Sequence, residues 1–283
     1  MAGAGLITLK RRMKSVTNTR KITKAMGLVA TSKLRKARVA LTKAQEYDSK
    51  YSAIFEEVLS NFDENSIYTA NNGSSKKLFV VITSETGLCG GYNSAVVNKL
   101  VESAGKDKEN TRILVVGQKG RSYFNRLKYE TVAEYVEVDD VPTVKEANTI
   151  AMHIFSLFNK KEVGEVYLAY TRFASSVKQE VQLDKLLPIN KPNSTEKNNY
   201  ISFEPPINEI FSYITEEYIK QKIYYCLTNA KSSEHAARMN TMDGATKNAN
   251  DLLDKLNLKY NRIRQSTITQ EISEIVGGAE AQR

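Results

Sequence analysis

The chain has few residues that end helices, and they are unevenly placed. All five prolines lie between Pro142 and Pro206, so residues 1–58 and 207–283 contain none. Both stretches repeat apolar residues at helical spacing, and at ~1.5 Å of rise per residue they would form helices of roughly 85 and 115 Å. Helices of compact domains average about 11–12 residues. The pattern therefore predicts two long arms, paired antiparallel, that enclose a folded middle.

Other scarce residues exclude several classes of protein. No run of about 20 apolar residues exists, so no segment is expected to span a bilayer. The amino terminus becomes charged before an apolar leader could form. Cys89 and Cys226 are too far apart for a metal or redox motif, and we expect free thiols. His153 and His235 are isolated, and no pair of carboxylates suggests acid–base catalysis. We expect no cofactor, no metal and no catalytic residue.

Positive charge is concentrated in the first arm. Residues 1–50 hold 13 Lys or Arg against Glu46 and Asp48, whereas the whole chain carries a net charge of only +9. A basic arm favours an acidic partner, which is nucleic acid, anionic lipid or an acidic protein surface. The arm has no aromatic residue before Tyr47 to stack on bases, which favours protein. A basic nucleic-acid-binding coiled coil and a solvated charged face remain alternatives.

Small residues lie along the apolar stripes of both arms. Ala30, Ala37 and Ala249 occupy such positions, where they permit close approach of two helices. The second stripe closes with Ile268, Ile272, Ile275 and Val276. The pair Gly277 and Gly278 is then predicted to end the helix.

The middle of the chain alternates between strand and helix patterns. Short apolar runs typical of buried strands are separated by amphipathic segments, which predicts a mainly parallel, Rossmann-like α/β sheet. An edge strand is expected to pair with its predecessor across a short turn. The expected strands are residues 78–82, 113–116, 132–138, 166–170 and, at the edge, 177–187.

A glycine-rich turn follows the first expected strand. Gly87, Gly90 and Gly91 suggest a nucleotide-binding loop, but GxGxxG is absent and no Lys-Ser/Thr follows the glycines. A tight strand-to-helix turn fits these residues better, and we expect no nucleotide binding. Cys89 within it has no neighbouring base and is a poor candidate for a nucleophile.

Three separated stretches carry a family resemblance. They are Asn-Thr-Arg-Lys-Ile-Thr-Lys-Ala-Met at 18–26, Gly-Leu-Cys-Gly-Gly-Tyr-Asn at 87–93, and Tyr-Asn-Arg-Ile-Arg-Gln at 260–265 with its continuation to 279. In this order they closely resemble the gamma subunit of rotary, F-type ATP synthases. The resemblance implies a three-part division into an N-terminal arm (1–58), an α/β head (74–190) and a C-terminal arm (207–283).

The same resemblance implies a function as the central rotor shaft. The coiled coil would penetrate a hexamer of alpha and beta subunits, and the head would lie beside the epsilon subunit on the ring of membrane-embedded c subunits. Flow of protons or sodium ions would turn the shaft and drive ATP synthesis, and the shaft would regulate ATPase activity without being catalytic. The chain has no inserted cysteine pair of the plastid type. A bacterial form is therefore expected, peripheral to the cell membrane on its cytoplasmic side.

The matched stretches also imply contacts with the catalytic subunits. Glu85 and Thr86 depart from the family's usual Asp and basic residue at this point, which puts a basic contact there in doubt. A contact that changes partner every third of a turn cannot be deeply buried in any one state. The candidates are Lys24, Met26, Glu85, Arg238, Gln265, Thr269 and Glu271.

Overall fold

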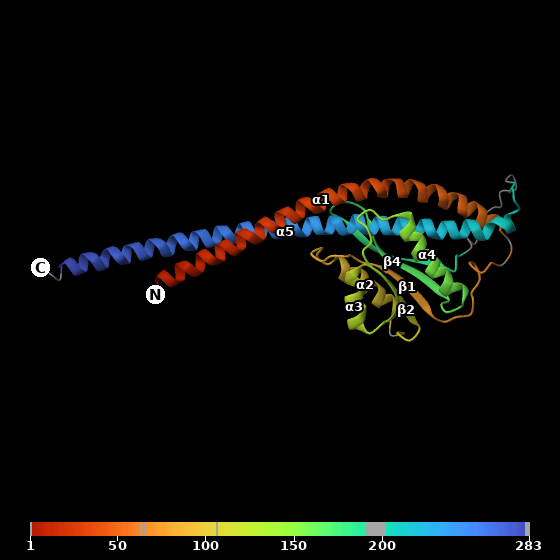
Figure 1. The fold of residues 1–283 in the computed structure, drawn as a ribbon, viewed down its shortest axis with the longest axis horizontal. Coiled ribbons are helices and arrows are strands. Elements are labelled where there is room, and N and C mark those ends of the chain that lie inside the picture. Colours follow the sequence, from red (N-terminus) through yellow and green to blue (C-terminus); the bar gives the residue numbers. More distant parts are fainter. Residues whose placement is uncertain (1, 63, 65, 106, 191–201, 281–283) are drawn as a thin grey trace. The chain divides into compact units, whose positions relative to one another are not determined.

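A computed structural model of the chain describes residues 2–62, 64, 66–105, 107–190 and 202–280 (Figure 1). It divides into two compact units, which we call the coil unit (Met1–Val29 with Met239–Arg283) and the head unit (Ala30–Arg238). This division cuts both long helices, whereas the three-part division expected from the sequence keeps each arm whole. The elements are α1 (Ala2–Asn61), β1 (Lys77–Ile82), α2 (Tyr92–Ala104), β2 (Thr111–Val116), α3 (Gln118–Leu127), β3 (Glu130–Tyr135), α4 (Val144–Asn159), β4 (Glu165–Phe173), β5 (Gln179–Leu187) and α5 (Ile207–Glu280).

The head unit is built on one five-stranded sheet in the order β3-β2-β1-β4-β5. The first four of these strands are mutually parallel, and β5 pairs antiparallel with β4 at the edge. The predicted mainly parallel sheet with an antiparallel edge strand is therefore confirmed. Strand β3 runs from Glu130 to Tyr135 rather than over 132–138, because Val138 pairs with side chains of other segments instead of with β2.

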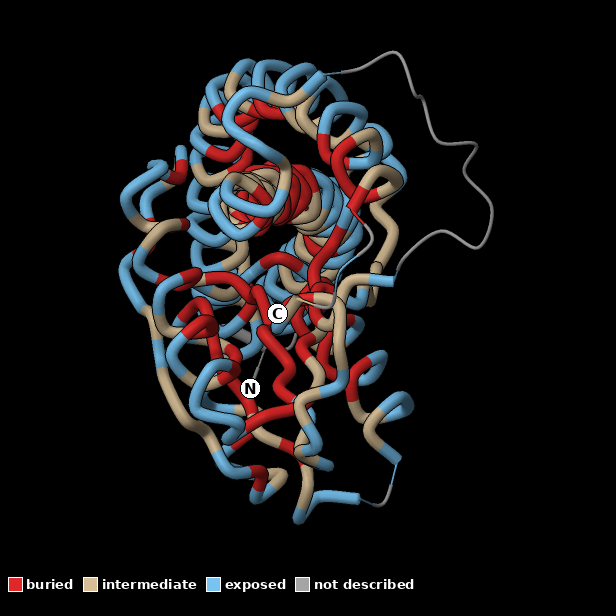
Figure 2. The backbone as a smooth tube through the Cα atoms, turned by 90° about the vertical axis from the view of Figure 1, so that its right-hand side faces the viewer, coloured by how far each residue is buried: buried red, intermediate tan, exposed pale blue. Residues whose placement is uncertain are grey.

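Helices cover both faces of the sheet because its central strands are apolar on both sides. Along β1, Phe79 and Val81 face α2 and α3, whereas Leu78, Val80 and Ile82 face α4 and α5. This alternation is the two-residue period of a strand. Figure 2 shows the buried residues concentrated along the strands and along the part of α5 that crosses the sheet.

The coil unit pairs the start of α1 with the end of α5. Thr23 Oγ1 lies 2.8 Å from Thr246 Oγ1, and Arg20 Nη1 donates to Asn250 Oδ1 at 3.2 Å. Lys10 Nζ lies 5.7 Å from the centre of the Tyr260 ring. Residue numbers rise on one helix as they fall on the other, so the predicted antiparallel pairing is confirmed in this unit.

The same antiparallel pairing continues within the head unit. Lys222 Nζ lies 3.3 Å from Asp48 Oδ2, and the Phe62 and Phe211 rings stack with centroids 3.6 Å apart. The small seam residues behave as predicted in their respective units: Ala30 and Ala37 are 1% exposed and Ala249 is 7% exposed.

Helix α5 continues past the predicted end at Gly277 and Gly278 and reaches Glu280. That prediction is wrong because a glycine keeps its backbone N–H and only costs a helix about 1 kcal/mol. Extending the observed register places the start of α1 opposite residue 268 or so. The last turns of α5 therefore have no α1 residues opposite them. The apolar residues that lie exposed there are Ile268, Ile272, Ile275 and Val276.

Candidate functional site: the carboxyl edge of the sheet and the surface of the coil

In doubly wound α/β folds, ligands bind outside the carboxyl ends of the strands, where the strand order reverses. Here that point lies at β1, which has β2 on one side and β4 on the other. Three segments lie at this edge: residues 84–91 after β1, residues 136–143 after β3, and residues 171–174 at the end of β4. We call them the cradle. Residues 229–238 of α5 lie against all three segments, so a helix of this chain occupies the crevice.

The end of β4 holds α5 through neutral hydrogen bonds. Ser233 Oγ donates to the carbonyl of Thr171 at 3.0 Å. The backbone N–H of Phe173 donates to Asn229 Oδ1 at 3.2 Å. Both α5 side chains are buried, so these bonds satisfy groups that have no access to water.

The segment after β1 holds α5 through Arg238. Its guanidinium donates to the carbonyls of Thr86 (2.8 Å) and Gly87 (3.2 Å) and to Glu234 Oε1 (2.7 Å). Arg238 is only 7% exposed. The predicted contact of Arg238 with the catalytic subunits is not tested by these bonds. The loop after β1 supplies two backbone acceptors, and a buried guanidinium needs such partners.

The segment after β3 meets α5 through charged groups. Lys231 Nζ donates to the carbonyl of Val138 at 2.8 Å and lies 3.7 Å from Glu234 Oε2. One turn further along α5, His235 Nε2 lies 3.3 Å from Asp140 Oδ1. The side chains of Lys231, Glu234 and His235 are all at most 5% exposed.

The surroundings of His235 define its protonation state. Burial lowers the pKa of His235 to about 4, and although Asp140 opposes this shift, neighbouring cations add to it. Arg238 Nη1 lies 3.3 Å from His235 Nδ1, and a guanidinium can only donate. The ring is therefore neutral at pH 7, with Nδ1 accepting and the proton on Nε2, which faces Asp140.

The glycine turn is the tight connection from β1 to α2 that the sequence predicted. The side chain of Asn93 binds the start of the turn through two hydrogen bonds. Its Oδ1 accepts the backbone N–H of Ser84 at 2.9 Å, and its Nδ2 donates to Ser84 Oγ at 2.7 Å. Gly90 has a φ of 60°, which favours glycine. Cys89 is buried beside Ser84, and burial raises the pKa of its thiol, so the thiolate is disfavoured at neutral pH.

Glu85 lies in the same turn and is engaged within the head unit. Its carboxylate accepts the backbone N–H groups of Gln118 and Val138, each at 3.1 Å. The carboxylate thus joins the segment after β1 to the start of α3 and to the segment after β3. The predicted contact of Glu85 with another subunit is not tested by these bonds.

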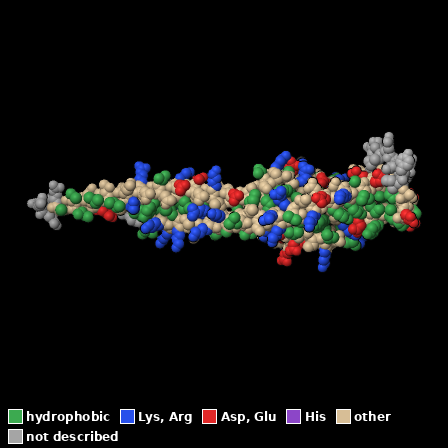
Figure 3. Space-filling view, turned by 90° about the horizontal axis from the view of Figure 1, so that it is seen from above, with side chains coloured by type: hydrophobic (Ala, Val, Ile, Leu, Met, Phe, Trp, Pro, Cys, Tyr) green, Lys and Arg blue, Asp and Glu red, His purple; other side chains and the backbone are tan. Residues whose placement is uncertain are grey.

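The remaining candidates lie in the coil unit. The side chains of Lys24, Gln265, Thr269 and Glu271 are exposed, and Met26 is half-buried. Figure 3 shows Lys and Arg side chains spaced along this unit and apolar side chains towards the carboxyl end of α5. The structure thus brings five of the seven candidates together in one unit, on two helices, and leaves Glu85 and Arg238 in the head unit.

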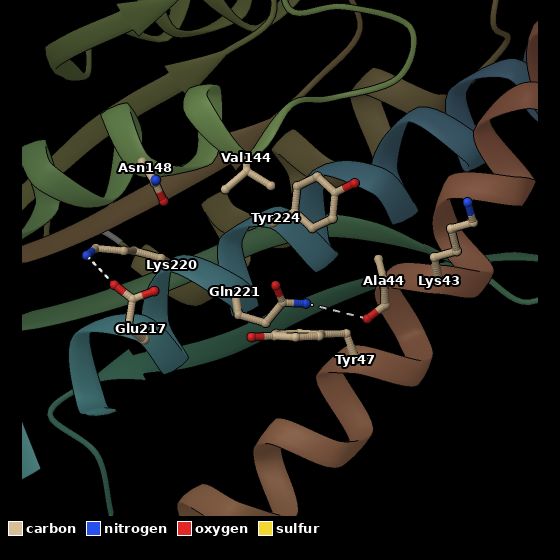
Figure 4. Close-up of a pocket in the computed structure, with 9 residues that line it drawn as sticks. All are labelled: Lys43, Ala44, Tyr47, Val144, Asn148, Glu217, Lys220, Gln221 and Tyr224. Carbon is tan, nitrogen blue, oxygen red and sulfur yellow. Dashed lines mark hydrogen bonds and ion pairs between the residues drawn. The ribbon is translucent and has the colours of Figure 1, made fainter. Parts of the chain in front are cut away.

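A cavity of about 330 Å³ opens in the head unit between α1, α4 and α5 (Figure 4). Two of its polar groups already have partners: Lys220 binds Glu217 at 2.7 Å, and Gln221 Nε2 donates to the carbonyl of Ala44 at 3.5 Å. None of its lining residues belongs to the glycine turn. The lining residues are Lys43, Ala44, Tyr47, Val144, Asn148, Glu217, Lys220, Gln221 and Tyr224.

Among the described residues, no three His, Cys, Asp or Glu side chains are grouped so that they could hold a metal ion. None of the helices in the described ranges has a stretch long and apolar enough to cross a membrane.

Sequence reasoning missed the polar cluster at the cradle. Lys231, Glu234, His235 and Arg238 follow one another at helical spacing of three, one and three residues, which places them on one side of α5. Such spacing on one side of a helix could have indicated a buried polar network. Its partners in the cradle could not be predicted, because they lie about 90 to 150 residues away.

Comparison with known proteins gives a consistent result. A family model described as ATP synthase matches residues 5–282. The "ATP synthase gamma chain" of Clostridium botulinum strain Hall is 54% identical over all 283 residues of both chains, and that of Clostridium pasteurianum is 52% identical over 99% of each.

Solved structures with a similar fold are also found. A chain of the Euglena gracilis mitochondrial ATP synthase (OSCP/F1/c-ring) has a TM-score of 0.77 at 17% identity, over 99% of this chain and 95% of that one. A chain of the Tetrahymena thermophila mitochondrial ATP synthase (central stalk/c-ring) has a TM-score of 0.62 at 25% identity, over 79% of this chain and 99% of that one.

Proposed function

The chain belongs to the ATP synthase gamma chain family and is the central rotor subunit of an F-type ATP synthase, and from this premise we propose how it works. The coil unit turns inside a catalytic hexamer of alpha and beta subunits. The head unit is fixed to a ring of c subunits beside the epsilon subunit. Proton or sodium ion flow through the membrane sector turns the ring and with it the chain, which thereby drives ATP synthesis.

The chain itself contributes no catalytic group in this proposal. The crevice where a doubly wound fold would bind a nucleotide is filled by residues 229–238 of α5, through the hydrogen bonds of Arg238 and Ser233. The subunit acts on ATP turnover only through contacts with its neighbours, and it regulates ATPase activity in the same way. It is peripheral to the cell membrane, on the cytoplasmic side.

The observation that carries the proposal is the uncovered end of α5. Beyond about residue 268 this helix has no α1 residues opposite it, yet it exposes Ile272 (57%), Ile275 (72%) and Val276 (56%). An exposed apolar patch indicates an interaction site. We propose that the hexamer surrounds this helix end with an apolar surface. A smooth apolar contact suits a turning shaft, because it is non-directional.

The candidate contacts of the coil unit fit the same role. Lys24, Gln265, Thr269 and Glu271 are exposed polar side chains, and Met26, two residues after Lys24, is half-buried. Each exposed contact contributes at most about 1–3 kcal/mol, in the range of a charge-assisted hydrogen bond. We propose that Lys24 faces acidic loops of the hexamer in turn as the shaft rotates.

Thiol protection tests the insertion. Ile275→Cys is placed in the chain, and the rate of labelling by a polar maleimide is compared between the isolated chain and the assembled complex. Glu102→Cys, on the exposed face of α2 in the head unit, is the matched control. We expect Ile275→Cys to become protected on assembly with alpha and beta subunits alone, and Glu102→Cys to label at the same rate in both states. Equal labelling of Ile275→Cys before and after assembly would contradict the proposal.

A further inference from the structure

The segment between β3 and α4 is held rigidly on both sides of Asp140. Before it, Val138 donates its N–H to Glu85 Oε1 at 3.1 Å. After it, Thr143 and Glu146 form a capping box at the start of α4. Glu146 also accepts the N–H of Asp139 at 3.1 Å. Asp140 is therefore presented from a fixed backbone.

The two oxygens of Asp140 contact two different helices. Oδ2 lies 2.8 Å from Lys33 Nζ on α1, and Oδ1 lies 3.3 Å from His235 Nε2 on α5. His235 in turn contacts Arg238, which binds the loop after β1. Burial alone would raise the pKa of Asp140, but Lys33 and other cations nearby hold it below its ordinary value. The carboxylate is therefore charged at neutral pH.

The apolar packing of α1 here is poor at resisting rotation. Between residues 30 and 44, its buried seam alternates Ala30, Leu34, Ala37, Leu41 and Ala44. Such a seam buries apolar area, but apolar contacts are non-directional. The short alanine side chains also interdigitate little with the neighbouring element. Polar contacts have preferred directions, so they are better able to fix the rotation of a helix about its own axis.

We propose that Asp140 is a positioning residue that ties α1 and α5 to the head, so that torque passes from the long helices into the head without slip. The proposal rests on the rotor function. Arg38 gives α1 a second contact with the head, with its guanidinium carbon 5.9 Å from the centre of the Phe173 ring at the end of β4. The side chains of Lys33 and Asp140 are 43% and 44% exposed, so their pair contributes little to folding. A loss of coupling can therefore be separated from a loss of structure.

The test uses the complete ATP synthase in membrane vesicles. ATP-driven ion pumping and ATP hydrolysis are measured side by side for Asp140→Asn, Asp140→Glu and Lys33→Gln. The control is Asp139→Asn, which makes the same change at the neighbouring, exposed carboxylate. We expect Asp140→Asn to assemble and hydrolyse ATP normally while the ratio of pumping to hydrolysis falls about twofold, as loss of an exposed ion pair of this strength allows. Asp140→Glu should restore the ratio, and Asp139→Asn should not change it.

A double variant identifies the contact. If Lys33 and Asp140 act through one interaction, Lys33→Gln combined with Asp140→Asn should lower the ratio no further than either change alone. Additive losses, a ratio for Asp140→Asn equal to that of Asp139→Asn, or failure of the Asp140→Asn complex to assemble would each overturn the proposal. If instead the wild-type chain did not assemble with its partner subunits, the proposed function would be at fault.

Discussion

Replacing Arg238 with Met would remove the guanidinium that joins α5 to the glycine turn while keeping most of the volume of the side chain. Four acceptors would lose this donor: the carbonyls of Thr86 and Gly87, Glu234 Oε1 and His235 Nδ1. Of these, the Thr86 carbonyl would still accept from Ser84 Oγ at 2.8 Å. The side chain of Glu234 is only 4% exposed, so its carboxylate would stay buried with Lys231 3.7 Å away as its remaining cation.

The expected cost follows from this geometry. Breaking a buried ion pair from one side costs about 3–5 kcal/mol, and because Lys231 remains nearby we expect a loss of about 3 kcal/mol for Arg238→Met. Combining it with Glu234→Gln removes the uncompensated charge. The loss in the free energy of unfolding of the double variant should therefore be smaller than the sum of the two single losses by about 1–3 kcal/mol.

The assay is urea unfolding of the complete chain, followed by far-ultraviolet circular dichroism and by the fluorescence of its tyrosines. Arg35→Met, at an exposed position of α1, is the matched control and should change the free energy of unfolding by less than about 0.5 kcal/mol. The reasoning would be refuted if Arg238→Met behaved like Arg35→Met, or if the losses of the Arg238 and Glu234 variants simply added.

Three further outcomes are expected from the head and coil units. Because the pKa of His235 is lowered to about 4 in the fold, the unfolded chain takes up its proton first, and stability should fall by about 3 kcal/mol as pH drops from about 6.5 to 4. His235→Gln should flatten this dependence in urea titrations, and an unchanged slope would contradict the buried neutral ring. Gly164→Ala should destabilise the head by at least about 2 kcal/mol in thermal melts, since its Cβ would lie 2.0 Å from a backbone oxygen. Gly244→Ala, with open space around it, should instead stabilise α5 by about 0.5–1 kcal/mol. Cys89 and Cys226 are buried, so they should react with a thiol reagent only on unfolding, and changing both to Ala should leave ATP turnover of the complex largely intact; fast labelling of the native chain would contradict this.

Elements defined by local pattern could be predicted from the sequence. The apolar runs at β1, β2 and β4 identified the buried strands, and the missing prolines identified α1 and α5. Strand β3 was placed too far along the chain because the apolar run continues to Val138. That residue is buried at 8% exposure, but its N–H binds Glu85 and its carbonyl binds Lys231. Its burial therefore arises from side chains of distant segments, which strand periodicity cannot indicate.

The residues of the candidate site also divide into those that local pattern predicts and those whose place depends on distant segments. Lys24 and Gln265 were expected on the surface of a coil, and helical spacing alone decides that they are exposed. The burial of Arg238 depends on two carbonyls about 150 residues earlier in the chain. The contact of Asp140 with Lys33 and His235 likewise brings three distant segments together. Polar clusters of this kind form only once the sheet has positioned its carboxyl edge, so they were missed.

Rotation of the chain inside its complex tests the central claim most directly. Glu102 is exposed on α2, near the amino ends of the strands and so at the opposite edge of the sheet from the cradle. With Cys89 and Cys226 changed to Ala, a Glu102→Cys variant can carry a small bead while the alpha and beta subunits are fixed to a surface. On addition of ATP, the account predicts unidirectional rotation of the bead in steps of a third of a turn. Steady ATP hydrolysis by complexes whose bead does not rotate would contradict it.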